Sequence, residues 1–455
     1  MVKGIKVIST DKSLSASGGL LLAKEALETS ALRLMVASSM PKDSFGATRS
    51  LDKFEAMILG SMAGAECLDD LERLAEDPAF AETASRCYSA KSFGNFLRAF
   101  DTYHCKLLQR SLIRQSLKLR RAAVGEIDSF TLDLDSTSNQ QYAKKMEGVE
   151  TNYKNIQCLD TLKAFDEFGF PYWHDVRPGA THTSSGAPEV IATVFRHLAD
   201  HSKNPWLKKY LRADSGYCNV DVFNACHTAG VQFVTHMRHN MLEPRIPTIY
   251  RWNRQNPEDS ARIRIHDGRE CEIGETVYLP DGGQQLLRIV CLRAEKRDLS
   301  ATPLFDDARY DYYAFVTNIP HSEMTAKEII YFYRKRGNSE NFIKEDKYGF
   351  DLKHYPCLKL TANKAYGLIT AFATAYMRFL SLIAGKKKTQ YAKATRHQLI
   401  HLPMQIVRHA GQVIFKFCKR HIQEVLNVLN KITSQQFGIN KQSPQSCGGR
   451  SLTIE

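Results

Sequence analysis

The spacing of apolar residues along the chain changes near residue 126 and again near residue 386. Residues 20–40 and 51–74 carry apolar side chains at helical intervals, and a loop with Pro41 and Gly46 separates them. Between residues 126 and 385, segments with strand-like alternation are interspersed with segments of helical spacing. Residues 386–455 are basic and end in a polar stretch. The pattern predicts a helical domain over 1–125, an α/β domain over 126–385 and a basic helical region with a loose tail over 386–455.

Two strand-like runs in the α/β part end in aspartate. Apolar residues at 130, 132 and 134 alternate with polar ones, which places Asp133 and Asp135 on the same face of the first strand. The second run ends in Asp214, where Gly216 permits a tight turn before a helix. Because open α/β sheets bind ligands beyond the carboxyl ends of their strands, these aspartates are candidate site residues. Asp133 and Asp135 are alternatives for the first position.

The other predicted strands lie on both sides of the Asp214 run. Strand-like segments near 158–168 and 171–176 and a helix over 188–201 precede it, and a strand over 231–237 follows it. Further short strands are predicted at 262–265, 272–279, 285–292 and 310–317. Most of these fall within about 240–312, which we interpret as a β-rich insertion into the α/β domain.

Residues 325–349 are predicted to form one helix, with Thr325 and Glu328 in a capping box and Gly349 at its end. At about 100° per residue, four side chains of this helix fall within an arc of about 60°. They are Tyr333, Arg336, Glu340 and Lys347. Such a face offers a carboxylate for a metal ion between cations for phosphates, although a solvated face with ordinary ion pairs has the same pattern. Lys344 is either another phosphate contact or an ion-pair partner of Glu340.

The charge of the chain indicates what it binds. With 62 Lys and Arg against 49 Asp and Glu, the net charge of +13 predicts an acidic partner, most simply nucleic acid. In the basic segment 89–121, Arg110, Arg114 and Lys118 recur every four residues. This ridge predicts part of a DNA-binding module of helix-turn-helix type, and a solvated basic face explains it equally well. The acid-free stretch 386–423 has the same two explanations.

The cysteines and the apolar runs indicate the cellular compartment in which the protein is expected and whether it spans a membrane. The eleven cysteines include no Cys-x2-Cys pair, which indicates a reducing compartment and argues against a disulfide framework or a zinc ribbon. The most apolar stretch, 365–384, contains Arg378 and several small residues. It therefore favours a buried core helix over a membrane span.

Three carboxylates from separate elements are able to hold two Mg²⁺ ions for phosphoryl transfer. The spacing Tyr-x2-Arg-x3-Glu-x6-Lys, together with the two aspartate strands and the insertion, resembles the DDE transposases of bacterial insertion sequences. It matches the group with a Tyr-Arg-Glu-Lys signature in the third catalytic segment. Residues 132–137, Leu-Asp-Leu-Asp-Ser-Thr, look like the family's first-aspartate strand, and residues 212–216, Arg-Ala-Asp-Ser-Gly, look like its second.

The resemblance implies an α/β ribonuclease-H-like catalytic core in which Asp135, Asp214 and Glu340 bind Mg²⁺, with Mn²⁺ as a possible substitute. It favours Asp135 over Asp133, because the family's aspartate precedes a small residue and Thr. It also implies that Tyr333, Arg336 and Lys347 contact the DNA backbone. The implied enzyme binds terminal inverted repeats, cleaves DNA strands and joins them to target DNA. It is expected to act as a homodimer in the bacterial cytoplasm, at the nucleoid and without a membrane.

Two other functions fit parts of the same pattern. One is a transposase-derived protein that binds DNA without cutting it, and its mark would be a broken carboxylate set or signature. The other is a ribonuclease-H-like nuclease that cuts without joining. The carboxylate set and the signature are both intact in this sequence.

Overall fold

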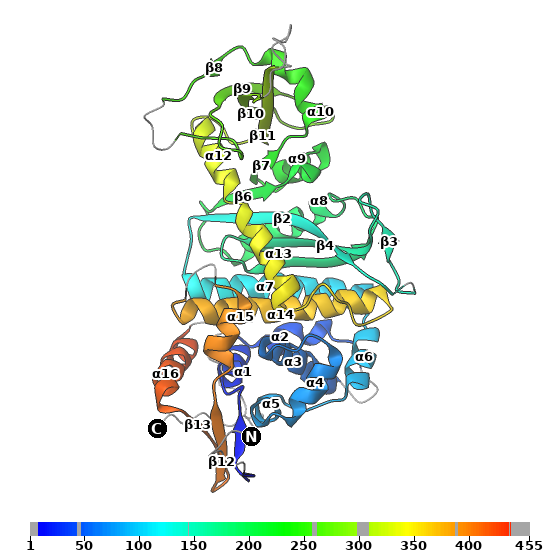
Figure 1. Cartoon of the computed structure of the whole chain (residues 1–455), viewed down its shortest axis with the longest axis vertical. Helices are drawn as coiled ribbons and strands as arrows, with labels where there is room; N and C mark the ends of the chain where they lie inside the picture. Colours follow the sequence, from blue (N-terminus) through cyan, green and yellow to red (C-terminus); the bar gives the residue numbers. More distant parts are fainter. Residues whose placement is uncertain are drawn as a thin grey trace, which may run out of the picture. The chain divides into compact units, whose positions relative to one another are not determined.

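The computed structural model describes residues 8–42, 47–143, 145–256, 262–297, 309–386, 390–435 and 437. Two compact units are present (Figure 1). The first, called the helical unit, combines 1–125, 141–149 and 344–455, and the second, called the sheet unit, combines 126–140 and 150–343. The chain is therefore divided differently from the expected domains, since the region after residue 344 joins the N-terminal helices. Residues 438–455 of the expected loose tail lie outside the described residues.

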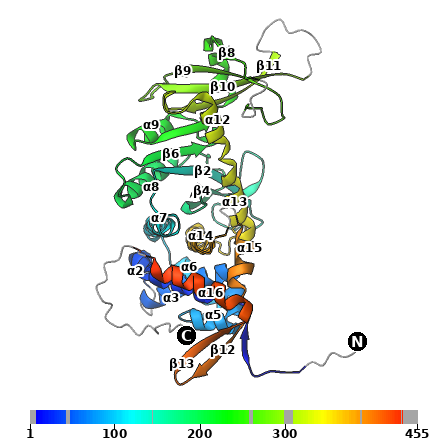
Figure 2. The same cartoon turned by 90° about the vertical axis from the view of Figure 1, so that its left-hand side faces the viewer.

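The helical unit is built around two long helices. Its described helices are α1 (Leu20–Thr29), α2 (Leu32–Val36), α3 (Ala47–Ala63), α4 (Leu68–Arg73), α5 (Pro78–Thr83), α6 (Ala90–Arg98), α7 (Thr102–Val124), α14 (Leu360–Ile383), α15 (Ala392–Thr395) and α16 (Lys419–Ser434). A small antiparallel sheet joins β1 (Ser13–Ser15), β12 (Met404–His409) and β13 (Gln412–Phe417). α14 packs along α7, as Figure 2 shows, and also against α3.

α14 is the apolar stretch that the sequence placed in the core. In the described part of the chain it is the one helix long and apolar enough to cross a membrane, yet 94% of its most apolar window is buried in the structure. Arg378 is buried as well and forms an ion pair with Glu345. The burial supports the expected core helix, because the apolar surface of α14 is already covered by protein.

The expected basic ridge on α7 does not lie on one solvated face. Arg110 is exposed, but Arg114 is half-buried and lies 3.5 Å from the Ser111 hydroxyl oxygen. Lys118 donates to the carbonyl of Ser30 at 2.6 Å, and burial lowers the pKa of its ammonium group. The helix is buried on most sides and serves as a core element of the helical unit, so its partly buried basic side chains extend along the protein surface.

The sheet unit is a mixed α/β structure with one continuous sheet. Its strands are β2 (Ser129–Gln140), β3 (Glu150–Thr151), β4 (Gln157–Asp166), β5 (Pro171–Pro178), β6 (Lys208–Ala213), β7 (Gln232–His236), β8 (Trp252–Asn253), β9 (Glu272–Tyr278), β10 (Leu287–Glu295) and β11 (Tyr310–Thr317). The order is β3-β4-β2-β6-β7-β11-β10-β9-β8, and β5 also pairs with β4. β2, β6 and β7 are parallel, while β4 and β11 run antiparallel to their neighbours in this group.

Strands from the expected insertion extend the sheet. β11 pairs with β7, and β10 and β9 follow in antiparallel order. The strand expected at 262–265 is reduced to a single bridge between Arg264 and Glu270. Helices α8 (Ala187–His201) and α9 (Val220–Thr228) cover one face of the sheet, and α12 (Ala326–Arg334) covers the other (Figure 2).

The single helix expected over 325–349 is wrong, because the structure contains two helices. The capping box at its start is confirmed: the Glu328 side chain accepts from the Thr325 backbone N–H at 2.8 Å. However, α12 ends at Arg334, and α13 (Gly337–Gly349) begins after a turn at 335–336. The arc calculated for an unbroken helix therefore does not hold across this turn.

A side chain from the sheet contacts the chain where α12 ends. The carbonyl of Phe332 accepts from the Arg212 guanidinium at 2.9 Å. In a continuous helix this carbonyl would accept the backbone N–H of Arg336. The Arg336 N–H instead donates to the carbonyl of Tyr333 at 2.8 Å. This hydrogen bond spans three residues rather than four and is typical of a turn.

Candidate active site

The parallel pairing of three strands stops at one level in the sheet unit: β6 ends at Ala213 and β7 at His236, while β2 continues past this level to Gln140. The register pairs Leu134 of β2 with Ala213 of β6, and Ala213 with Thr235 of β7. The next residue along each strand is Asp135, Asp214 and His236, respectively. Parallel strands present their carboxyl ends at the same sheet edge, so the two predicted aspartates come together there with a histidine.

Asp135 is nearly buried and has a guanidinium beside it. Its Oδ2 accepts from Arg336 Nη1 at 3.0 Å, and its Oδ1 accepts from the Ser136 backbone N–H at 2.8 Å. Burial, aided by the charge of Asp214 and opposed by Arg336, raises the pKa of Asp135 to about 6. The Asp135 carboxylate therefore lies in a site that disfavours a lone negative charge and favours a nearby cation.

Asp214 begins the turn that follows β6. Its Oδ1 accepts the Gly216 backbone N–H at 2.8 Å, which caps the short 3₁₀ helix over Ser215–Tyr217. Arg238 holds the same turn from outside by donating to the carbonyls of Ser215 and Gly216. The turn thus fixes the Asp214 backbone and leaves the carboxylate only half-buried.

Asp133, the alternative to Asp135, has a different environment. It is fully buried, and both of its oxygens accept from Arg212, at 2.6 Å from Nε and 2.7 Å from Nη2. Because the same Arg212 holds the Phe332 carbonyl, the Asp133–Arg212 pair joins β2, β6 and the end of α12. Asp133 is thus engaged in a buried structural ion pair.

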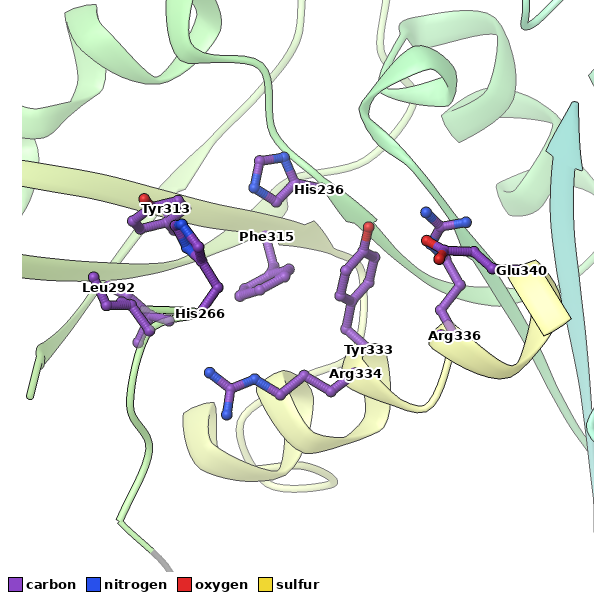
Figure 3. A pocket seen from close by; sticks show the side chains of 11 residues that line it. His236, His266, Leu292, Tyr313, Phe315, Tyr333, Arg334, Arg336 and Glu340 are labelled. Atoms are coloured by element: carbon purple, nitrogen blue, oxygen red, sulfur yellow. The ribbon is translucent and has the colours of Figure 1, made fainter. Parts of the chain in front are cut away.

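The turn between α12 and α13 brings the signature residues to the strand ends. The Arg336 guanidinium lies 5.8 Å from the centre of the Tyr333 ring while it contacts Asp135. Glu340, in the first turn of α13, has an exposed side chain. Figure 3 shows the side chains of Tyr333, Arg336 and Glu340 lining the same cavity as Arg334, which extends away from Arg336 and Glu340.

This cavity has a volume of about 240 Å³ and a largely aromatic wall. Its lining consists of His236, Ile265, His266, Leu292, Tyr313, Phe315, Tyr333, Arg334, Arg336, Gly337 and Glu340. The Phe315 and Tyr333 rings pack 4.8 Å apart, and the His236 ring lies 5.8 Å from that of Phe315. The cavity therefore combines flat apolar surfaces with two guanidinium groups and one carboxylate.

His236 is a site residue that the sequence analysis missed. Burial lowers the pKa of its imidazole, although the charge of Asp214 acts in the opposite direction. A lowered pKa leaves the ring neutral at pH 7, so it is able to accept a hydrogen bond or a proton. His236 lies at the end of the third parallel strand, level with Asp214. The sequence alone does not give the strand register that shows this.

The remaining predicted residues belong to the helical unit. Lys344 and Lys347 lie on the later part of α13, four and seven residues after Glu340, with Lys344 exposed and Lys347 half-buried. Arg110 and Arg114 lie on α7. The sheet unit thus contains Asp135, Asp214, Tyr333, Arg336 and Glu340, with Arg336 in contact with Asp135 and Glu340 in the cavity lining, whereas the four basic residues belong to the other unit.

The carboxylates fit a divalent metal ion by their chemistry. Asp135 and Asp214 are hard oxygen donors at adjacent strand ends, and their mutual repulsion is the kind that a dication relieves. As they stand, no three His, Cys, Asp or Glu side chains of the described residues lie close enough to hold an ion. The contact of Arg336 with Asp135 places a monovalent cation at this position instead.

The mixed α/β fold and the two carboxylates next to Arg336, which lines a basic and aromatic cavity, are features of an enzyme that acts on phosphate esters. The family model described as "Transposase DDE domain group 1" matches residues 2–436, nearly the whole chain. The chain therefore belongs to this family of transposases, whose substrate is DNA. No curated protein matches it.

Proposed function

We propose that the protein is a bacterial insertion-sequence transposase that binds terminal inverted repeats, cleaves DNA at the ends of its element and joins the freed ends to target DNA. The observation that carries this proposal is the placement of Asp135 and Asp214 on neighbouring strands, with Arg336 in contact with Asp135 and in the same cavity lining as Glu340. The signature Tyr333, Arg336, Glu340 and Lys347 supports the insertion-sequence group.

The strand order also supports a ribonuclease-H-like core. Within the sheet, β5-β4-β2-β6-β7 has β2, β6 and β7 parallel and β4 antiparallel to β2. This is the arrangement implied by the resemblance, with Asp135 in the first strand of the core and Asp214 at the end of the fourth. The strands β8 to β11 then form the inserted part between the second aspartate and Glu340.

In this proposal Asp135, Asp214 and Glu340 hold Mg²⁺. When bound, two such ions stabilise the entering and leaving oxygens of an in-line phosphoryl displacement. Asp135 is favoured over Asp133 because Arg212 already occupies both oxygens of Asp133. Mn²⁺ accepts the same oxygen donors and is expected to substitute.

The other residues would bind and orient DNA. Arg336 and Tyr333 face the carboxylates and would hold a backbone phosphate near the cleaved bond, with Lys344 and Lys347 as further phosphate contacts. The exposed Arg110, with Arg114, would add sequence-independent attraction to the duplex. Pairing both ends of an element would require a homodimer, acting in the cytoplasm on nucleoid DNA.

A direct assay tests the proposed function. The purified chain is incubated with Mg²⁺ and a duplex that carries the inverted repeats found beside its gene, together with a supercoiled target plasmid. Nicks at the repeat ends and covalent joints to the plasmid are expected. Binding without nicks would instead favour a non-cleaving DNA-binding protein, and nicks without joints would favour a nuclease.

The affinity of the site for divalent ions is expected to depend on pH through Asp135. Its folded-state pKa of about 6 is above the ordinary value of about 3.9, and the ion needs the ionised carboxylate. Mn²⁺ affinity should therefore be nearly constant above about pH 7 and weaken by up to about tenfold per pH unit below about pH 6. Isothermal titration calorimetry at several pH values measures this, and an affinity unchanged down to pH 5 would contradict it.

The raised pKa of Asp135 also affects the stability of the metal-free protein. Metal affinity is expected to increase with pH, whereas this contribution to stability decreases with pH. In the unfolded state the Asp135 carboxyl ionises at a lower pH than in the folded state. Its contribution therefore makes the folded state less stable as pH rises from about 4 to about 6. Thermal unfolding of the wild type and of Asp135→Asn over this pH range isolates the contribution, since the amide does not titrate.

A further inference from the structure

The contact between Arg336 and Asp135 places a fixed cation at the proposed metal position. Arg336 Nη1 lies 3.0 Å from Asp135 Oδ2, and both side chains are only 13% exposed. The charges of Asp135 and Asp214 both raise the pKa of the Arg336 guanidinium, so it interacts with the two carboxylates at once. In the DNA-free protein, the positive charge that balances this carboxylate pair therefore comes from the chain itself.

We propose that Arg336 is a latch that keeps the metal site closed until DNA binds. In the closed state the guanidinium holds Asp135, and in the open state it binds a backbone phosphate and frees the carboxylate for the divalent ion. This inference rests on the proposed function and concerns the regulation of the same site. It assigns Arg336 a second role besides holding DNA, which is to couple the two binding events.

The chemistry of the guanidinium supports such an exchange. Arginine binds phosphate and carboxylate with the same planar pair of N–H donors, so a phosphate entering the cavity competes directly with Asp135. A divalent ion cannot share Asp135 with the guanidinium without strong repulsion between the two cations. DNA phosphate and metal ion therefore favour the same open state, and each should raise the affinity for the other by the same factor.

The local backbone provides room for the change. Arg336 lies in the turn between α12 and α13 rather than within a helix. The following Gly337 has open space where a Cβ would be, with nothing within 4 Å. On the other side, Tyr333 lines the cavity next to Arg336 and can remain in contact with the guanidinium in either state.

The test measures metal binding, not catalysis, in the full-length chain. Mn²⁺ binding is followed by electron paramagnetic resonance for the wild type and for Arg336→Gln, with and without a short duplex of arbitrary sequence at low ionic strength. Without DNA, Arg336→Gln should bind Mn²⁺ about ten- to a hundredfold more tightly than the wild type, which is the range expected for loss of a charge-assisted hydrogen bond. DNA should raise the affinity of the wild type by a larger factor than that of the variant.

A matched control separates the latch from a general effect of positive charge. Arg334 lines the same cavity, but its guanidinium contacts the Arg264 carbonyl rather than Asp135. Arg334→Gln removes one positive charge nearby and should change Mn²⁺ affinity far less than Arg336→Gln. Equal gains in the two variants would overturn the latch.

The remaining outcomes distinguish the latch from the function it regulates. If Asp135→Asn, introduced into Arg336→Gln, abolishes the tight Mn²⁺ binding, the freed carboxylate is the ligand and the latch is supported. If the DNA-free wild type binds Mn²⁺ as tightly as Arg336→Gln, the latch is wrong while the proposed function stands. If no variant binds Mn²⁺ even with DNA, both the latch and the metal-dependent function are wrong.

Discussion

The Asp214→Asn variant is expected to lose DNA strand cleavage by about a thousandfold or more while it retains the fold and DNA binding. Asparagine preserves the Oδ1 acceptor that caps the turn at Gly216, so the backbone at the strand end should not change. The substitution removes the negative charge of Asp214, which lies just after the end of β6 and acts on Asp135 of the neighbouring strand β2. Gel analysis of nicked products and a binding titration with the same duplex measure the two properties separately.

Asp221 provides a matched control for this variant. It is an exposed aspartate in the first turn of α9, close in sequence to Asp214, but its charge does not act on Asp135 or Arg336 as that of Asp214 does. Asp221→Asn makes the same chemical change and should leave cleavage within about twofold of the wild type. Full cleavage by Asp214→Asn, with Asp221→Asn as active, would remove Asp214 from the proposed site.

The Asp133→Ala variant is expected to be destabilised by about 3–5 kcal/mol. Removing this carboxylate leaves Arg212, which is 3% exposed, as an uncompensated buried charge at the junction of β2, β6 and α12. Denaturant unfolding, followed by circular dichroism, gives the free energy directly. The loss of activity in this variant should follow from the loss of folded protein.

Asp135→Ala is the variant whose stability and activity should be compared with those of Asp133→Ala. Asp135 lies two residues away on the same strand, but it is bound to its arginine by one hydrogen bond rather than two, and that arginine also interacts with Asp214. Its removal should cost far less stability and should abolish cleavage. The double variant Asp133→Ala with Arg212→Met should lose less than the sum of the single changes, because it leaves no buried charge. Equal destabilisation by Asp133→Ala and Asp135→Ala would contradict the assignment of their roles.

Local patterns in the sequence located most of the elements that carry the site. The alternation around Asp135, the Gly turn after Asp214 and the capping box at Thr325 depend on a few neighbouring residues, and the structure shows all three. The family followed from the spacing of the signature and the order of the aspartate strands, which remain readable without knowledge of packing.

Contacts between distant residues decided the rest. Arg212 reaches from β6 to the Phe332 carbonyl where α12 ends, and Arg336 in the following turn contacts Asp135, which no helical projection of 325–349 could include. The packing of α14 on α7 buried a helix whose charges suggested an exposed ridge. Strand register alone placed His236 beside Asp214. The sequence by itself determined which side chains are present and their local backbone, because those depend on short-range sterics and hydrogen bonds. Which charges face one another was decided only by the tertiary structure, because it depends on contacts between residues far apart in the chain.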